Sequence, residues 1–172
     1  RVVLELSSFQ LMDSLPVINH AVITNIIPNH LDFHRDFPEY IDAKKNIFRS
    51  QGVTDTLTLN ANDDVSSRFI GEASGRTRFF NAKYLGNDVT AWRGAGALYM
   101  RRSPCSQPET IIQEKDVLLP GSFNLDNVMA AAVTTADDVT LDAVRAVAKT
   151  FKGVAHRMEL VGEHDGVRWY NS

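Results

Sequence analysis

The chain opens with a carboxylate at a position typical of a cation ligand. Glu5 lies at the end of the apolar run 2–6, and Ser7, Ser8 and Gln10 follow it. In open α/β sheets, ligands bind beyond the carboxyl ends of the strands, so a carboxylate there could hold a hard cation such as Mg²⁺. Spacing alone favours the alternative, a strand-end glutamate that only caps the Ser7-Ser8 turn.

A second polar group follows the next apolar run. It reads Asn29-His30-Leu31-Asp32-Phe33-His34. Histidine is a common metal ligand, and polar side chains at alternate positions could converge on a metal or a phosphate. Loops after buried strands are polar in any case, so this pattern alone indicates little.

Lys44 lies within an apolar stripe on the helix predicted after Pro38. The stripe consists of Tyr40, Ile41, Ile47 and Phe48, whereas Asp42, Lys45 and Arg49 point elsewhere. The commoner outcome is a lysine whose ammonium reaches solvent along the apolar surface. The alternative is an amine whose pKa falls on desolvation. A neutral amine of this kind could take up CO₂ as a carbamate, and that anion could itself approach a metal.

Two more groups lie in the second half of the chain. Asn124 and Asn127 share one face in the first turn of a predicted helix, where an anion could also bind. Plain N-capping by Ser122 or Asn124 is the alternative. Arg157, after His156, stands at a predicted domain junction and could clamp a phosphate, although an exposed surface arginine is the default.

The elements that must position these groups alternate between strands and helices. Strands are expected at 2–6, 20–27, 56–60 and 77–80, and helices at 9–15, 36–51, 65–73, 124–136 and 141–151. Short strands with Gly, Pro and Ser between them indicate an antiparallel excursion over 86–114. Asp165-Gly166 predicts a hairpin between 158–161 and 167–170. The pattern predicts an α/β fold, mostly parallel, with a boundary near Gly153.

Composition excludes several classes of protein. A 19.2 kDa chain with net charge −3 and pI about 5.9 is unsuited to a nucleic-acid surface. No apolar run is long enough for a transmembrane helix, and the single Cys105 excludes an internal disulfide and suits a reducing cytoplasm. The sequence holds no G-x-x-x-x-G-K-[ST] phosphate loop. Because both ends lie within apolar segments, we expect a piece of a longer chain.

Taken together and in order, five motifs resemble those of the Mur ligases. They are Val3-Leu4-Glu5-Leu6-Ser7-Ser8-Phe9-Gln10-Leu11, Thr24-Asn25-Ile26 running into Asn29-His30-Leu31-Asp32, Tyr40-Ile41-Asp42-Ala43-Lys44, Leu119-Pro120-Gly121 with Asn124 and Asn127, and His156-Arg157-Met158-Glu159. The stretch 5–11 is most similar to the branch of the family that adds D-glutamate.

The resemblance implies a fold and an activity. Residues 1–154 would be most of a central ATP-binding domain without its phosphate loop, and residues 155–172 would begin a C-terminal, Rossmann-like amino-acid-binding domain. The implied enzyme is a cytoplasmic, monomeric ligase of peptidoglycan precursor synthesis. It would use ATP to join D-glutamate to UDP-N-acetylmuramoyl-L-alanine through an acyl phosphate, without a nucleic-acid or membrane partner.

The resemblance also implies roles for particular residues. Two Mg²⁺ sites are implied, one at Glu5 and one at His30 and Lys44, with Lys44 carbamylated; these three would be the catalytic residues. The implied substrate contacts are Ser7 and Gln10 for the muramoyl-alanine substrate, and Asn124, Asn127 and Arg157 for the nucleotide.

Two alternatives remain open at this point. The chain could come from a relative that adds another amino acid, such as another Mur ligase or a folylpolyglutamate synthase. It could also be a noncatalytic fragment. Without a backbone cradle for phosphates, we expect the 172-residue chain alone to bind Mg-ATP weakly and to be inactive.

Overall fold

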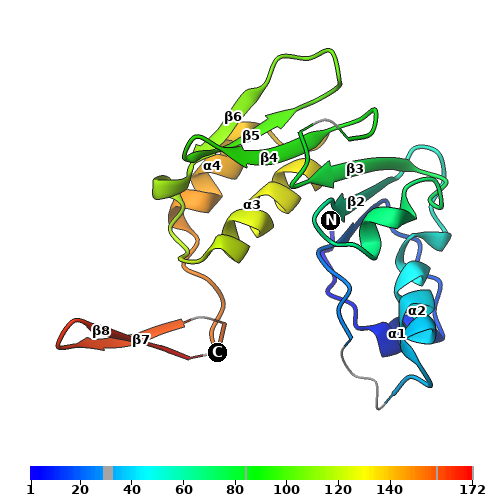
Figure 1. Ribbon diagram of the computed structural model, residues 1–172, viewed down its shortest axis with the longest axis horizontal. Helices are drawn as coiled ribbons and strands as arrows, with labels where there is room; N and C mark the ends of the chain where they lie inside the picture. Colours follow the sequence, from blue (N-terminus) through cyan, green and yellow to red (C-terminus); the bar gives the residue numbers. More distant parts are fainter. Residues whose placement is uncertain (29–32, 84, 158, 172) are drawn as a thin grey trace.

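A six-stranded sheet forms the centre of the computed structural model, which describes residues 1–28, 33–83, 85–157 and 159–171 (Figure 1). The strands lie in chain order: β1 His20–Ile23, β2 Thr56–Asn60, β3 Arg76–Phe80, β4 Thr90–Gly94, β5 Ala97–Arg101 and β6 Glu109–Gln113. β1 to β4 are parallel, and β5 is antiparallel to both β4 and β6. The predicted α/β class is therefore confirmed, and the antiparallel excursion extends the same sheet.

Helices cover both faces of this sheet. They are α1 Ser8–Met12, α2 Phe37–Arg49, α3 Ser122–Thr134 and α4 Leu141–Thr150, with short 3₁₀ helices η1 Ser66–Phe69 and η2 Glu114–Asp116. α3 packs along β1 to β5, α4 packs on β6, and α1 packs on α2. Within the described ranges, no helix has both the length and the apolar character needed to cross a bilayer.

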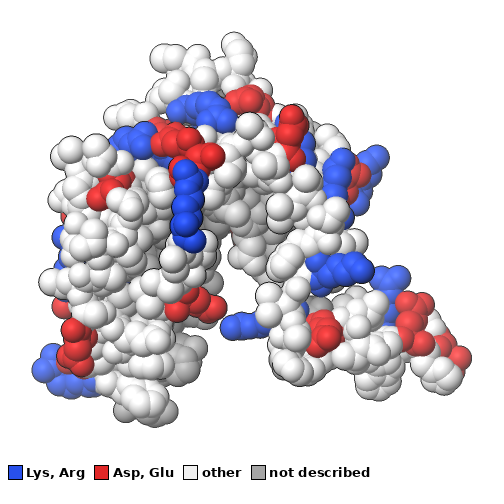
Figure 2. Space-filling model, turned by 180° about the vertical axis from the view of Figure 1, so that it is seen from behind, with Lys and Arg blue, Asp and Glu red and all other residues white. Residues whose placement is uncertain are grey.

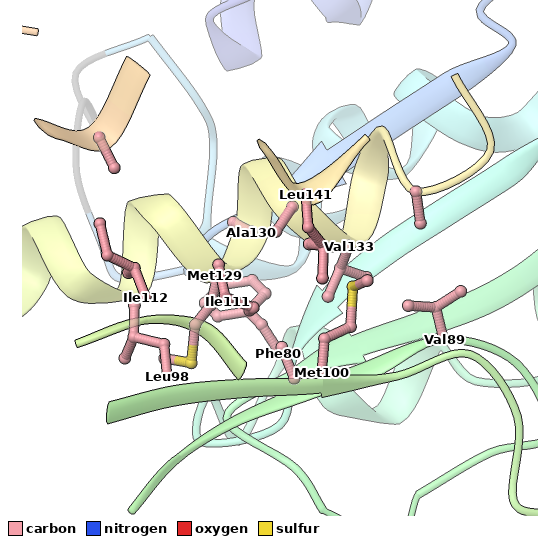
Figure 3. Packing of buried hydrophobic residues seen from close by; sticks show 14 of the residues in the cluster. Phe80, Val89, Leu98, Met100, Ile111, Ile112, Met129, Ala130, Val133 and Leu141 are labelled. Atoms are coloured by element: carbon pink, nitrogen blue, oxygen red, sulfur yellow. The ribbon is translucent and has the colours of Figure 1, made fainter. Parts of the chain in front are cut away.

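Strand alternation divides the core into two clusters. Phe79 and Phe80 are neighbours in β3, yet Phe79 belongs to the cluster with α2 and Phe80 to the cluster with α3 and α4. Successive side chains of a strand point to opposite faces, which explains the division. Figure 3 shows the cluster that contains Phe80, in which Met129 and Val133 of α3 face Leu98 and Met100 of the sheet.

Local signals set the limits of α2. The Asp36 carboxylate accepts a hydrogen bond of 2.9 Å from the Glu39 N–H, as the predicted N-cap requires. Glu39 in turn accepts from the Arg35 N–H, one residue before the cap. The helix ends at Arg49, two residues before the predicted end, because Gly52 instead begins a turn closed by Asp55.

Several predicted elements were wrong in extent or type. The helix predicted over 9–15 is α1, which ends at Met12. Residues 2–6 form no strand, and Val3 is 97% exposed, since no described strand lies beside this run to supply ladder hydrogen bonds. The strand predicted over 20–27 stops at Ile23. The helix predicted over 65–73 is only the 3₁₀ turn η1, and Gly71 beyond it has φ +84°, which ends any helix.

The predicted hairpin is confirmed. β7 Glu159–His164 and β8 Val167–Asn171 pair antiparallel, and Asp165 and Gly166 at the turn both have positive φ. The hairpin projects away from the six-stranded sheet (Figure 1). Seen from behind, a recess separates the hairpin from the rest of the molecule, and acidic and basic side chains intermingle over this face (Figure 2).

A buried arginine joins β3 to the end of α3. Arg78 has no exposed surface, and its guanidinium donates to the Val133 carbonyl at 3.1 Å and to Asp137 at 2.5 Å. Arg76, on the same strand, donates to Asp137 at 2.7 Å. The hydrogen bond from Arg76, opposed by partial burial and reinforced by Arg78, holds the pKa of Asp137 below its ordinary value.

Replacing Asp137 should therefore weaken the fold and change its response to acid. A carboxyl group whose pKa is lowered by folding stabilises the native state above its ordinary pKa and loses that contribution as the pH falls through the folded value. We expect Asp137→Asn to lower the free energy of unfolding by about 2 kcal/mol at pH 7, because Arg78 stays buried. The loss should shrink toward pH 3.

Urea unfolding at pH 7 and pH 3 measures both effects. Asp138→Asn is the matched control, because Asp138 pairs with the exposed Arg1 and the partly exposed His20, and it should cost less than about 1 kcal/mol. Equal losses for the two variants at pH 7 would contradict the role assigned to Arg78.

Candidate functional site

Three of the predicted site residues come together from distant parts of the chain. Glu5 precedes α1, Lys44 lies in α2, and Arg157 lies in the link between α4 and β7. The Arg157 Nη2 lies 3.9 Å from the Glu5 Oε1, and the Glu5 carboxylate acts electrostatically on Lys44. Both partners of the ion pair are largely exposed, so the pair itself adds little stability.

Lys44 is half-buried, with its Nζ 5.8 Å from the centre of the Tyr40 ring. Burial lowers the pKa of the Lys44 amine, and the Glu5 carboxylate raises it in partial opposition. A larger fraction of this amine is therefore neutral at neutral pH than for an ordinary lysine. Only the neutral form attacks CO₂, so burial shifts this amine in the direction that favours a carbamate.

The neighbouring lysine is held quite differently. The Lys45 Nζ lies 2.8 Å from Glu72 and 4.7 Å from the Phe69 ring centre. This matches the expectation that Lys45 points away from Lys44. Both adjacent lysines lie over an aromatic ring, but Lys45 has an ion pair at 2.8 Å with Glu72, whereas Lys44 has only the more distant Glu5 charge.

Ser7 and Gln10 form the N-cap of α1. The Ser7 N–H donates to the Gln10 Oε1 at 2.8 Å, and the Gln10 N–H donates to the Ser7 Oγ at 3.4 Å. The turn is thus capped by Ser7, whereas the Glu5 carboxylate points to solvent with 94% of its side chain exposed. The predicted contacts of Ser7 and Gln10 with substrate stay predictions.

His30 lies outside the described residues, together with Asn29, Leu31 and Asp32, so its role as a metal ligand stays a prediction. His34 from the same motif is described, and it is buried. Its Nε2 shares a hydrogen bond of 2.8 Å with the Ser8 Oγ, and its ring meets the Tyr40 ring edge-on at 5.3 Å. Sequence reasoning included His34 only among the loop residues that could converge on a metal or a phosphate, and it missed the burial, because a polar loop residue carries no signal of it.

Asn124 and Asn127 form a hydrogen-bonded pair in the first turns of α3. The Asn127 Nδ2 donates to the Asn124 Oδ1 at 3.3 Å, and the Asn124 Nδ2 donates to the Pro120 carbonyl at 2.7 Å. The alternative, in which Ser122 or Asn124 caps the helix, is wrong. Its N-cap is Gly121, with φ +97° and no side chain to accept a hydrogen bond.

The link that carries Arg157 lies beside the approach to α3. Gly153 has φ +94°, and a Cβ there would come within 3.2 Å of Leu119 and 3.8 Å of the Arg157 carbonyl. The link therefore packs beside Leu119, which precedes α3, and the predicted nucleotide contacts of Asn124, Asn127 and Arg157 stay predictions.

The donor groups on this side of the molecule suit a hard cation. Divalent magnesium prefers oxygen ligands, and Glu5 supplies a solvent-facing carboxylate. A carbamate on Lys44 would add a second anionic oxygen donor, whereas the amine itself is a poor ligand for magnesium. Within the described ranges, no three His, Cys, Asp or Glu side chains gather into a metal cluster.

Comparison with known proteins gives one consistent result. The family model described as the Mur ligase middle domain matches residues 1–135. The UDP-N-acetylmuramoylalanine--D-glutamate ligase of Clostridium botulinum is 43% identical over 171 residues, and that of Acetivibrio thermocellus is 42% identical over 179. Each alignment covers 99% of this chain but only 36% of the relative, so the chain spans about a third of these curated ligases.

Solved structures support the fold. A MurF structure from Acinetobacter baumannii aligns with TM-score 0.65 at 18% identity, and MurC from Thermotoga maritima aligns with TM-score 0.60 at 18%. Each alignment covers 92% of this chain and 34% of the other. At these identities the likeness concerns the fold alone.

The electrostatic link between Glu5 and Lys44 can be measured directly. Glu5→Gln removes the opposite charge that raises the pKa of Lys44, so the pKa of this amine should fall further. Glu72→Gln, which removes the partner of Lys45, should leave the Lys44 titration in place. NMR titration of ¹³C-labelled lysine side chains measures the Lys44 pKa in both variants. A Lys44 pKa that is higher in Glu5→Gln than in the wild type would refute the link.

Proposed function

The chain belongs to the Mur ligase family through its middle domain, and on that premise we propose that it is part of an ATP-dependent D-glutamate-adding ligase. The reaction would join D-glutamate to UDP-N-acetylmuramoyl-L-alanine during peptidoglycan precursor synthesis in the cytoplasm. The single observation that carries this proposal is the 41–43% identity to curated UDP-N-acetylmuramoylalanine--D-glutamate ligases along the whole chain.

The proposed chemistry has two steps. The terminal phosphoryl group of ATP passes to the alanyl carboxylate, which gives an acyl phosphate and ADP. The D-glutamate amine then attacks the acyl carbon, the bond from that carbon to the phosphate oxygen breaks, phosphate leaves and the amine loses a proton. Negative charge accumulates throughout, so the site must supply compensating charge.

Particular residues have assigned places in this proposal. Glu5 and a carbamylated Lys44, with His30, would hold two Mg²⁺ ions, which would neutralise charge on the transferring phosphoryl group. Burial of Lys44 supports the carbamate, because it favours the neutral amine. Arg157 would contact the nucleotide, and its ion pair with Glu5 supports a position close to that carboxylate.

The remaining assignments follow the same reasoning. Asn124 and Asn127 would contact the nucleotide from α3, and Ser7 and Gln10 would lie near the muramoyl-alanine substrate. Residues 1–154 would form the ATP-binding domain, and residues 155–172, which include the projecting hairpin, would begin the amino-acid-binding domain. The full-length ligase would work as a monomer, without nucleic acid or membrane.

Loss of the Lys44 amine tests the carbamate role. In the full-length ligase that contains this chain, we expect Lys44→Ala to lower turnover by at least about 100-fold, since it removes an electrostatic contribution of the size that such groups supply. Small carboxylic acids should partly restore activity by replacing the carbamate oxygens. Lys45→Ala is the matched control and should retain most activity; unchanged turnover in Lys44→Ala would rule the carbamate role out.

Amino-acid choice separates D-glutamate addition from other family activities. Phosphate release by the full-length ligase, measured with D-glutamate, L-glutamate, L-alanine and L-lysine in parallel, should depend on D-glutamate. Release with another amino acid alone would favour a different Mur ligase or a folylpolyglutamate synthase.

A further inference from the structure

His34 has the contacts of a residue that positions others. It is 5% exposed, although it comes from a polar loop motif, and its ring lies between two helices that carry site residues. The Nε2 hydrogen-bonds with Ser8 at the start of α1, and the ring edge meets Tyr40 on α2.

The stability of the fold alone does not explain this imidazole. The His34 Nδ1 is buried and has no hydrogen-bond partner among the residues that the structure describes. An unpaired buried nitrogen costs free energy, and an apolar side chain of similar size would avoid that cost. What the imidazole provides is a flat ring against Tyr40 combined with one polar atom directed at Ser8.

The Tyr40 ring in turn contacts Lys44. The two residues are one helical turn apart, and the Lys44 Nζ lies over the Tyr40 ring at 5.8 Å from its centre. The Phe37 ring also stacks on the Tyr40 ring, with 5.8 Å between the ring centres, so His34 and Phe37 both restrict the Tyr40 ring. An ammonium or amine over a fixed ring has fewer positions available than one over a mobile ring.

We propose that His34 is a positioning residue: its ring fixes Tyr40, and thereby the Lys44 amine, while its Nε2 ties α1 to α2. The functional meaning rests on the proposed ligase, in which the Lys44 amine carries the carbamate. The two contacts can be separated, because glutamine can place a polar atom near the Nε2 position without a ring, and phenylalanine keeps a ring without the hydrogen bond.

The test uses the chain itself, with ¹³C-labelled lysine. Protons of the Lys44 side chain near the Tyr40 ring should be displaced upfield by its ring current. His34→Gln should remove most of that displacement, and His34→Phe should keep it. Lys45, which lies over the Phe69 ring, is the internal control and should keep its own displacement in both variants.

The contrast between the two variants distinguishes positioning from general stability. A role in stability alone would leave the Lys44 signal unchanged in every folded variant, and that result would overturn the proposal. A displacement lost in His34→Phe but kept in His34→Gln would overturn it too, because the hydrogen bond would then control Lys44. Unfolding curves for each variant show that the spectra come from folded protein.

A second readout keeps the proposed function separate. With ¹³C-bicarbonate, a carbamate signal on Lys44 should appear in the wild type and fall by about twofold or more in His34→Gln, because a mobile Tyr40 ring lets water reach the amine and weakens the desolvation that favours its neutral form. His20→Phe, which removes a histidine bonded to Thr56 elsewhere, should leave it unchanged. Absence of carbamate in the wild type would contradict the proposed role of Lys44, whereas the ring-current result would still decide the role of His34.

Discussion

The buried guanidinium of Arg78 is the contact on which the rest of the structure depends. It lies on β3, the strand whose successive residues belong to the two core clusters, and it donates to backbone carbonyls at the end of α3 and to Asp137. A fully buried charge is tolerated only when it is paired, so α3 must end where those acceptors meet β3. Because α3 is a straight element packed along β1 to β5, fixing its last turn also fixes its first.

That constraint determines where the candidate site can form. The first turns of α3 carry Asn124 and Asn127, and the segment before them packs beside the link that carries Arg157. The other side of the site depends on α2, whose buried face leaves Lys44 half-covered. Glu5 lies between the two sides, close enough to interact with both Lys44 and Arg157. The site therefore joins elements from opposite faces of the sheet.

Short-range patterns predicted much of this fold. The alternation of strands and helices gave the α/β class, the Asp36 cap gave the start of α2, and Asp165-Gly166 gave the hairpin. The failures involve longer-range effects. An apolar run such as 2–6 becomes a strand only beside another strand, and its composition cannot supply that partner.

The site was predictable to a similar degree. The unusual place of Lys44 was visible in the helical stripe, because periodicity reports which face a residue occupies. The closeness of Glu5 to both Lys44 and Arg157 was not visible without the family resemblance, since it depends on how the sheet and helices pack. The burial of His34 was also hidden, because it depends on a hydroxyl and a ring that come from two other segments.

Manganese(II) binding to the ¹⁵N-labelled chain, measured in bicarbonate buffer, tests most directly whether Glu5 and Lys44 hold cations. The paramagnetic ion broadens amide signals near the place where it binds, and it can stand in for Mg²⁺ at oxygen ligands. We expect the amides of Glu5 and Lys44 to broaden first and that of Arg157 next. Broadening centred on Asp137 and Asp138, or spread evenly over the acidic residues, would contradict cation sites at Glu5 and Lys44.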